Sequence, residues 1–416
     1  MLIVVGLIVV TLLGAPLFAV IGASAMAGFH GEGVDLSVVA IEFFGLSETT
    51  VLVAIPLFTF AGFLLSAGQA PRRLVKLSQA VLGWLPGGLA MISLVTCALF
   101  TAFTGASGVT IIALGALLFP ALTEAGYDER FNLGLITASG SIGLLFAPSL
   151  PLILYGIVAE QPIDRLFVAG VLPGMLLVLT LSAYCFWRNR GVHRARNGSW
   201  RELKSALWAA RWDLPLPIVV LGGIYSGYFA VSEAAAVTAL YVLIVEVVIL
   251  REVRWAGLPD VMRESMVLVG AIFLILGMSL ASTNYMIDSG VPQKLFTAVS
   301  GYIAGPRSFM VVLLVFLLIL GTILDIFSAT VLVVPLLLPI AAQYQIDPIH
   351  LGIVFLAAME LGYLTPPVGL NLFISSHRFN RDIAEIYLAT QPFLIVSFVA
   401  VVIIAFWPDL SLMLLP

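Results

Sequence analysis

Two apolar stretches, residues 83–124 and 306–343, constrain the fold most strongly. Each carries polar residues at its centre, Thr-Gly-Ala-Ser at 104–107 in the first and Leu-Asp-Ile-Phe-Ser-Ala-Thr at 324–330 in the second. Each stretch is about twice as long as the roughly 20 residues that cross a bilayer. A plain pair of crossings would put the polar centre in a loop outside the membrane. We therefore expect two re-entrant helical hairpins with polar tips at mid-depth.

The composition indicates that the rest of the chain also lies in a lipid bilayer. Of 416 residues, 61% are apolar and only 10% are charged, against about 25% charged in soluble domains. The first apolar run is interpreted as a retained helix, since no basic segment precedes it. Two cysteines are too few for a disulfide framework or a zinc site. We expect full crossings at 1–22, 50–68, 131–160, 166–187, 214–229, 231–250, 265–286, 349–377 and 391–412.

Loop charges predict the orientation of these segments. Lys and Arg cluster at 72–76, 188–211 and 251–263, and the positive-inside rule places all three clusters in the cytoplasm. Two crossings separate the first cluster from the second only if 83–124 is re-entrant. The N-terminus is then cytoplasmic and the C-terminus periplasmic. The first hairpin enters from the cytoplasm and the second from the periplasm.

An internal repeat accompanies this inversion. Residues 132–149 align without a gap to 350–367, which matches Leu-Gly to Leu-Gly and Pro148 to Pro366. The second arm of each hairpin also contains an apolar-Pro sequence, LLFP and LLLP. Two copies in opposite orientation are typical of secondary transporters. The predicted fold is an all-α polytopic membrane protein with inverted repeats, each made of a re-entrant hairpin and a proline-broken helix.

The proline-broken helices are candidates for chemistry. Pro148 and Pro151 in the first, and Pro366-Pro367 in the second, each remove a helix hydrogen bond. Carbonyls near 144–147 are then expected to lack helix partners, which is tolerated at mid-membrane only inside protein or at a cavity. The alternative is a pair of ordinary proline kinks. Their recurrence at equivalent positions beside polar tips favours a functional site.

The tip residues are suited to bind a cation and an anionic substrate. Hydroxyls and carbonyls around Thr104 and Ser107, and the carboxylate of Asp325, are ligands of the kind that Na⁺ takes, while helix N-termini attract a substrate carboxylate. The alternatives are hydroxyls bonded to their own helices and an N-cap role for Asp325, which is compatible with ion binding. Glu360 is a further candidate, and Glu233 is interpreted as part of a helix start.

Other functional classes are disfavoured. The four histidines are scattered, so metal ligation is not expected, and no nucleophile–base pair indicates an enzyme. The basic run 188–211 is interpreted as an amphipathic helix on the anionic cytoplasmic leaflet, and nucleic-acid binding has no support. Residues 36–48 are predicted to form a second interfacial helix.

Five motifs, in order along the chain, resemble the large membrane (DctM-like) subunit of tripartite ATP-independent periplasmic (TRAP) transporters. They are FTGASGVTIIALG at 103–115, GLLFAPSLPLILYG at 143–156, GGIYSGYFAVSEAAAVTALY at 222–241, LDIFSATVLVVPLLLPIA at 324–341 and LTPPVGLNLF at 364–373. The resemblance implies a sodium-coupled importer of a small organic acid anion in the bacterial inner membrane. A periplasmic substrate-binding protein would deliver the anion, and a separate small four-helix membrane subunit would complete the complex. The family also implies an elevator mechanism.

The same resemblance implies particular site residues. One sodium site would use Thr104, Gly105 and Ser107 with the break at Gly143, Phe146 and Pro148. The other would use Asp325, Gly362 and Thr365, and the substrate would lie near Ser149, Ser328 and Asn371. The first tip departs from the Ser-Gly-Ser-Ser that is common in the family, because Ala106 replaces a serine. Backbone carbonyls are then expected to carry more of the ion binding.

The expected domain plan follows these elements. Residues 1–82 and 188–300 are assigned mainly to a scaffold, and 83–187 to a first transport repeat with hairpin 83–124 and broken helix 131–160. Residues 301–416 contain the second repeat, with hairpin 306–343 and broken helix 349–377, and the C-terminal helix. The alternative function is a self-sufficient ion-coupled carboxylate transporter of similar fold.

Overall fold

The computed structural model describes the chain except for residues 1–5, 8, 12, 83–86, 191–199, 301, 302, 304 and 416. Every regular element in the described part is helical. Seven of these helices are long and apolar enough to cross a membrane, and the bent pair α8–α9 would make an eighth span. The predicted all-α membrane architecture is confirmed.

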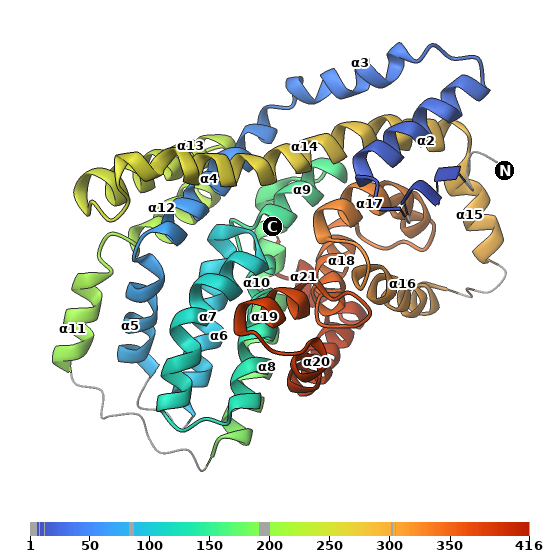
Figure 1. Ribbon diagram of the computed structural model, residues 1–416. Helices are drawn as coiled ribbons and strands as arrows, with labels where there is room; N and C mark the ends of the chain where they lie inside the picture. The colour runs from blue at the N-terminus through green and yellow to red at the C-terminus, as the bar shows by residue number, and fades with distance from the viewer. Residues whose placement is uncertain are drawn as a thin grey trace.

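A layer of helices forms one edge of the molecule (Figure 1). Its spine is α14 (Leu258–Asp288), which packs on α2 (Leu17–Gly31), α3 (Ser37–Gly45) and α4 (Ala54–Ala67). Close contacts fix this layer, because a Cβ on Gly277 would lie 2.1 Å from the Phe43 ring. Helices α12 (Pro215–Tyr225) and α13 (Val231–Leu243) complete the layer, whereas α5 (Ala70–Leu82), α11 (Trp200–Ala209) and α15 (Val291–Ser300) lead away from it (Figure 1). We call this layer the scaffold.

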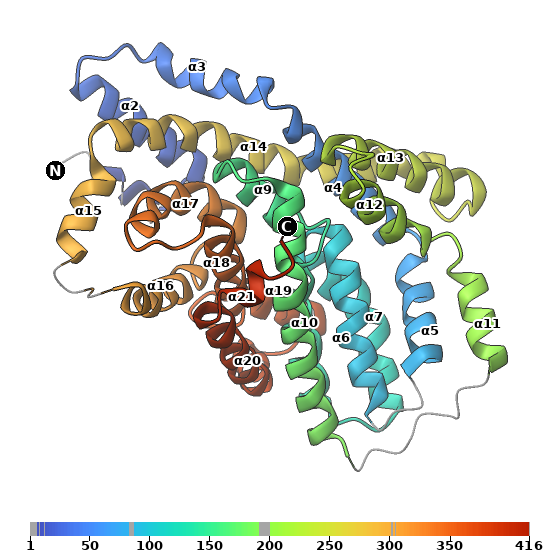
Figure 2. The same ribbon diagram turned by 180° about the vertical axis from the view of Figure 1, so that it is seen from behind.

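Both predicted hairpins are present. The first consists of α6 (Gly88–Thr104) and α7 (Ser107–Glu124), and the second of α16 (Pro306–Gly321) and α17 (Ile326–Gln343). Only a few residues separate the arms in each hairpin, and these residues are the polar centres of the two apolar stretches. Figures 1 and 2 show the hairpins on either side of α8–α10.

Both broken helices are also present. The first runs from α8 (Glu129–Ser139) through a short 3₁₀ turn, η3 (Ile142–Leu145), to α9 (Leu150–Val158), with a bend of 43°. The second runs from α18 (Pro348–Gly362) to α19 (Leu370–Phe379). Helices α8 and α18 start alike, because Asp128 and Asp347 cap them by accepting backbone hydrogen bonds.

The two broken helices run in opposite directions past each other. The first half of one meets the second half of the other, because the Thr137 hydroxyl of α8 donates to Ser375 of α19 at 2.8 Å. At the opposite end, the Tyr155 hydroxyl of α9 donates to the Pro348 carbonyl of α18 at 2.5 Å. This antiparallel crossing confirms the inverted repeats. Helices α10 (Ile163–Arg188) and α20 (Ile383–Phe406) enclose them, and the short α21 (Asp409–Leu412) follows.

Several predicted segments have different bounds in the structure. The predicted crossing 1–22 is wrong as a single helix: its described part turns at Leu13–Gly14, and α2 starts after Pro16 and extends to Gly31. Pro16 cannot continue a helix with a backbone donor, which explains the break. The predicted crossing 391–412 starts earlier, at Ile383, and stops before Pro408. The helix expected at 214–229 is shorter.

Helices are present in both segments that were predicted to be interfacial, and their position at the membrane surface stays a prediction. A helix lies within 36–48, as α3, and another within 188–211, as α11; residues 191–199 of that run lie outside the described part. Glu233 accepts a hydrogen bond from the Ala230 amide at 2.9 Å, so it does stabilise the start of α13. Arg73 forms ion pairs with Asp213 and Glu252. Arg73 of the first basic segment thus contacts Glu252 in the third and Asp213 just after the second, which agrees with a common side of the membrane for these parts of the segments.

Candidate ion and substrate site

The two hairpin tips line one cavity of about 370 Å³. The first tip contributes Gly105 to Val109, and the second contributes Asp325 to Phe327. The scaffold closes the cavity with four apolar residues of α14, and α19 adds Leu370 and Ile374. The α14 residues are Leu268, Ala271, Ile272 and Ile275. Elements 220 residues apart in sequence thus meet at a single chamber between the repeats and the scaffold.

The first tip presents an uncapped helix N-terminus to this cavity. Gly105 ends α6 with φ of 65°, and a Cβ there would lie 2.4 Å from Leu150, so the tight turn requires glycine. Helix α7 starts at Ser107 after Ala106, which has no side-chain oxygen to cap it. The first amides of a helix lack intrahelical partners and attract anions. This end of the cavity is therefore chemically suited to a carboxylate.

The second tip is capped. Asp325 accepts hydrogen bonds from the amides of Phe327 and Ser328 at 2.9 and 3.0 Å, and from the Ser328 hydroxyl at 2.5 Å. The N-cap interpretation of Asp325 is confirmed. Its carboxylate also lines the cavity, so this end offers negative charge. The two tips differ in electrostatic character although they belong to equivalent hairpins.

Thr101 and Thr110, one turn behind the first tip, form a polar cluster with Thr104, and the sequence analysis identified only Thr104 of these three. The Thr101 hydroxyl lies 2.7 Å from that of Thr110 and donates to the Gly140 carbonyl at 2.9 Å. The hydroxyl of Thr104 lies 3.5 Å from that of Thr110. All three threonines are buried. A single threonine in an apolar arm is commonly bonded to its own helix. Several threonines close to the same tip were the signal in the sequence that could have revealed the cluster.

The first break packs directly against the first hairpin. A Cβ on Gly143 would lie 2.2 Å from the Ala98 carbonyl of α6, so only glycine fits there. The Phe146 amide donates to the Gly143 carbonyl, and the Phe146 carbonyl accepts from the Ser149 amide at 3.1 Å. Of the carbonyls expected to lack partners, that of Phe146 therefore has one. Pro148 is buried beside it.

The second break repeats this packing. A Cβ on Gly362 would lie 2.5 Å from the Gly321 backbone of α16. The Thr365 hydroxyl donates to the Leu361 carbonyl at 2.9 Å, which is the helix-bonded alternative for that residue. Thr365 lines a second cavity of about 490 Å³ between α16 and α20, so it does not share the tip cavity with Asp325. The peptide bonds before Pro148 and Pro367 are both cis.

The three residues assigned to substrate lie behind the cavity wall. Ser149, Ser328 and Asn371 are buried, and none of them lines the tip cavity. Asn371 reaches the first repeat, where its Nδ2 lies 3.4 Å from the Thr137 carbonyl. In the described part of the chain, Ser149 Oγ, Asn371 Oδ1 and Glu360 Oε1 are buried without a hydrogen-bond partner. Such atoms need a ligand or water, so both breaks hold polar groups that are available to a ligand.

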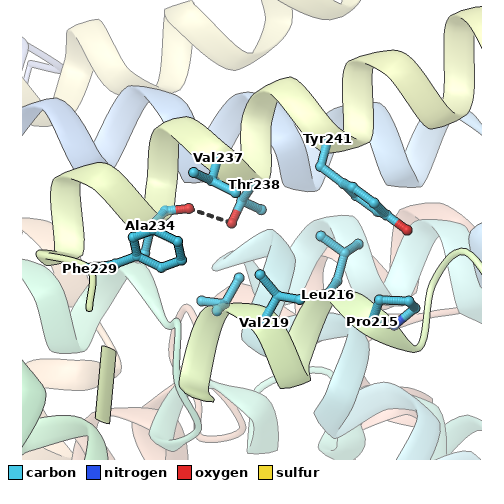
Figure 3. Close-up of a pocket in the computed structure, with 9 residues that line it drawn as sticks. Pro215, Leu216, Val219, Phe229, Ala234, Val237, Thr238 and Tyr241 are labelled. Atoms are coloured by element: carbon cyan, nitrogen blue, oxygen red, sulfur yellow. Dashed lines mark hydrogen bonds between the residues drawn. The ribbon is translucent and has the colours of Figure 1, made fainter. Parts of the chain in front are cut away.

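A third, smaller pocket lies between α12 and α13, and its apolar walls do not indicate a binding site. It has a volume of about 30 Å³ and apolar walls that include Leu216, Val219 and Phe229 (Figure 3). The Thr238 hydroxyl in its wall donates to the Ala234 carbonyl of its own helix at 2.6 Å. No polar group on this wall is oriented to select a ligand.

Comparison with known proteins decides the family. The model of the DctM component of the tripartite ATP-independent periplasmic transporter matches residues 4–410. This chain belongs to the DctM family of TRAP transporters. It is therefore a large membrane subunit of such a transporter, as its motifs predict.

Individual relatives cover nearly the whole chain. The C4-dicarboxylate TRAP transporter large permease protein DctM of Pseudomonas aeruginosa is 34% identical over 90% of this chain and 88% of its own length. That of Rhodobacter capsulatus is 31% identical over 99% and 98%. The isethionate TRAP transporter permease protein DctMQ of Oleidesulfovibrio alaskensis is 33% identical over 96% of this chain, which spans 64% of that relative.

A solved structure shows the same fold at low sequence similarity. The YdaH transporter of Alcanivorax borkumensis superposes with a TM-score of 0.63 over 91% of this DctM-family chain and 88% of its own. The identity is 12%, so this likeness concerns the fold alone.

Proposed function

We propose that this DctM-family chain is the permease subunit of a sodium-coupled importer of a small organic acid anion. A periplasmic binding protein delivers the anion, and a separate small four-helix membrane subunit completes the complex in the bacterial inner membrane, with the N-terminus cytoplasmic and the C-terminus periplasmic. The observation that supports this most is the cavity in which an uncapped helix N-terminus faces a carboxylate. One end suits an anion and the other a cation.

The ion ligands we propose are divided between the two repeats. Thr104, Gly105 and Ser107 belong to the first site, with carbonyls of the break at 143–148. Asp325 belongs to the second site, with the backbone of Gly362 at the neighbouring break. We leave Thr365 out of this site, because it lines a different cavity from Asp325. Oxygen donors of this kind, held by helix ends and breaks, are suited to a hard monovalent cation. The polar atoms of Ser149 and Asn371 that lack partners lie behind the cavity wall and are proposed to orient the substrate through water.

The walls of the tip cavity support an elevator movement. On the scaffold side the α14 residues are apolar, whereas the polar groups lie on the hairpins. An apolar wall makes no directional bonds to the ligand, so the hairpins and broken helices can slide past it while they carry ligand and ions. The Ser279 hydroxyl of α14 donates to the Val331 carbonyl of α17 at 2.9 Å, and a sliding movement of α17 along α14 would break this hydrogen bond.

Sodium binding is tested on the purified chain in detergent. Its melting temperature is measured in NaCl and in KCl or choline chloride at equal ionic strength. We expect NaCl alone to raise the melting temperature, because a ligand that binds only the folded state stabilises it. Equal stability in all three salts contradicts sodium coupling. Substrate uptake by the chain alone, without binding protein, would instead favour the self-sufficient transporter.

A further inference from the structure

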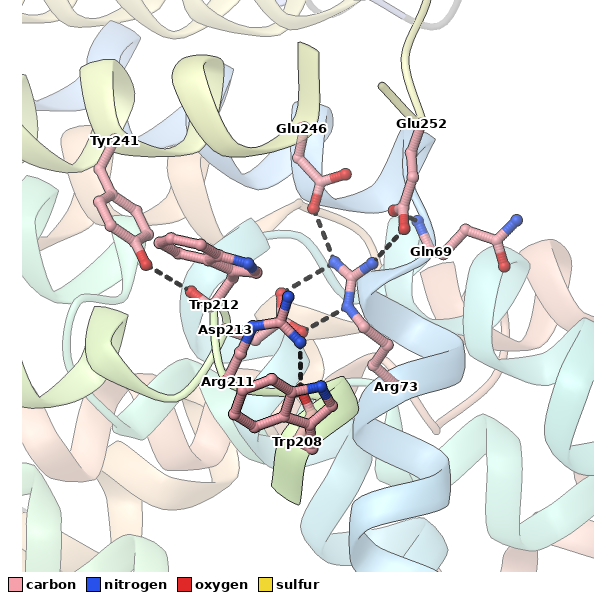
Figure 4. Close-up of polar contacts among 9 residues, drawn as sticks. All are labelled: Gln69, Arg73, Trp208, Arg211, Trp212, Asp213, Tyr241, Glu246 and Glu252. Atoms are coloured by element: carbon pink, nitrogen blue, oxygen red, sulfur yellow. Dashed lines mark hydrogen bonds and ion pairs between the residues drawn. The ribbon is translucent and has the colours of Figure 1, made fainter. Parts of the chain in front are cut away.

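A buried ionic cluster lies outside the tip cavity, where α5 joins the scaffold (Figure 4). Arg73 of α5 is at its centre. Asp213 comes from the segment between α11 and α12, Glu246 from the π-helical end of α13 (Ile244–Ile249, η4), and Glu252 from the loop that follows. Helix α5 leads from α4 to the first hairpin, so the cluster fixes the link between the scaffold and a moving part.

Almost all hydrogen-bond donors of the Arg73 guanidinium have an acceptor. Its Nε and Nη2 donate to the two oxygens of Asp213 at 2.6 and 3.0 Å. Its Nη2 also donates to Oε1 of Glu246 at 2.8 Å, and Nη1 donates to Oε1 of Glu252 at 2.5 Å. Because a guanidinium has five N–H groups, little capacity remains for a further acceptor.

Other groups near the cluster do not supply a second positive charge. Arg211 donates to the Trp208 carbonyl and stacks on the Trp208 ring at 4.4 Å. Arg72 donates to the Gln69 side chain, and the Tyr241 hydroxyl donates to the Trp212 carbonyl. The other charged residues on these elements, Lys76, Arg251 and Arg254, are exposed. One buried cation therefore faces three carboxyl groups.

In this arrangement one carboxyl oxygen of Glu246 is left without a hydrogen-bond partner. Its side chain has no solvent exposure, and its Oε2 has no hydrogen-bond partner in the described part of the chain. A Cβ on Gly68 would lie 2.2 Å from this oxygen and 3.3 Å from Oε2 of Glu252. The two carboxyl groups therefore adjoin the same small space beside Gly68. A buried carboxylate oxygen without a partner is costly unless it is protonated.

We propose that Glu246 is a proton-binding site, whose Oε2 holds a proton directed toward the Glu252 carboxylate. The cluster then contains one cation, two carboxylates and one carboxylic acid. The proton comes from solvent past Glu252, whose side chain is 19% exposed. Loss of the proton adds a second uncompensated negative charge to a buried cluster, which weakens the attachment of α5 to the scaffold.

The state of Glu252 agrees with its role as acceptor. Burial raises the pKa of Glu252, but hydrogen bonds from Arg73 and from the Gln69 amide outweigh this and keep its pKa below the ordinary value. Glu252 is therefore ionised at neutral pH. The local backbone is unusual as well. Glu246 lies in the π-helical segment η4, and π-helical segments are common at functional sites. The amides of Glu252 and Val253 both donate to the Glu246 carbonyl.

The proton is tested with neutral variants of the full chain in detergent. Gln is isosteric with a protonated glutamic acid and can donate to Glu252, so Glu246→Gln should match the melting temperature of the parent at about pH 4 and melt no lower than the parent at neutral pH. Glu252→Gln and Asp213→Asn should lower it, since each removes a charge that pairs with Arg73. Glu264→Gln, on an exposed part of α14, is the matched control and should change nothing.

Two further readouts make the test decisive. The parent should lose stability as the pH rises from about 4.3, where a glutamate in the unfolded chain ionises, until Glu246 ionises in the folded chain, and Glu246→Gln should lose less over the same range. Infrared difference spectra should show a protonated-carboxyl carbonyl band in the parent that is missing in Glu246→Gln and retained in Glu264→Gln. The proposal is overturned if Glu246→Gln is as unstable as Asp213→Asn, if it fails to fold, or if it leaves that band unchanged.

Discussion

The backbone amide of Ile326 donates a 2.6 Å hydrogen bond to the hydroxyl oxygen of Tyr363. This bond joins the second hairpin tip to the second broken helix, 37 residues further along the chain. Both residues line the tip cavity. The position of the tip therefore depends on the broken helix, as the proposed elevator movement requires.

Removal of this acceptor should be measurable. Tyr363→Phe leaves the buried Ile326 amide without its partner, which costs about 1–3 kcal/mol. We expect a lower melting temperature in detergent and a reduced stabilisation by NaCl. Tyr228→Phe, at an exposed tyrosine, is the control and should behave like the parent. An unchanged melting temperature for Tyr363→Phe would show that the bond does not hold the tip.

The carboxylate of Asp325 can be separated from its cap function. Asparagine caps helices about as well as aspartate, so Asp325→Asn should fold with little loss of stability but lose the stabilisation that NaCl confers. Asp347→Asn makes the same change at the N-cap of α18, where Asp347 accepts from the Ile349 and His350 amides. That control should retain the response to NaCl. Equal responses of the two variants would remove Asp325 from the ion site.

The uncapped first tip offers a matched pair of substitutions. Ala106→Asp should cap α7, which adds about 0.5–2 kcal/mol of stability, but its charge should repel a substrate anion from the cavity. Ala106→Asn supplies a neutral cap of the same size. We expect the aspartate variant to abolish uptake and the asparagine variant to retain it. Equal uptake by both variants would place the anion elsewhere.

The glycines at the breaks should not tolerate alanine. Cβ atoms at Gly143 and Gly362 would overlap the Ala98 carbonyl and the Gly321 backbone, respectively. Overpacking of this kind costs about 1–3 kcal/mol or more, so both variants should melt at lower temperature. Gly222→Ala in α12 is the control, because a Cβ there meets no atom within 4 Å. Normal stability of Gly143→Ala and Gly362→Ala would show that the breaks are loosely packed.

Features that a short stretch of sequence encodes were predictable. Polar residues in the middle of long apolar stretches identified both hairpins, and the prolines at 148 and 366 identified both breaks. The N-cap role of Asp325 followed from its place before a helical pattern. The missing side-chain oxygen at Ala106 was visible too, although its consequence, an uncapped α7 facing the cavity, required the structure.

Features that depend on distant partners were not predictable. Arg73 belonged to a basic cluster in the sequence, yet it meets Asp213 and Glu252, which lie 140 and 179 residues away. The separation of Thr365 from Asp325 into two cavities depends on how α16 and α20 pack. Periodicity and local motifs do not encode such contacts, because they arise from the packing of whole repeats.

Sodium-driven uptake tests the central claim most directly. The chain is reconstituted in proteoliposomes with its small membrane subunit, and the binding protein is added with a radiolabelled acid that a thermal-shift screen of that protein has identified. We predict uptake under an inward Na⁺ gradient that requires the binding protein, stops when choline replaces Na⁺, and is lost in Asp325→Asn but kept in Asp347→Asn. Uptake of equal rate in choline, or equal uptake by the two variants, would contradict a sodium-coupled site between the hairpin tips.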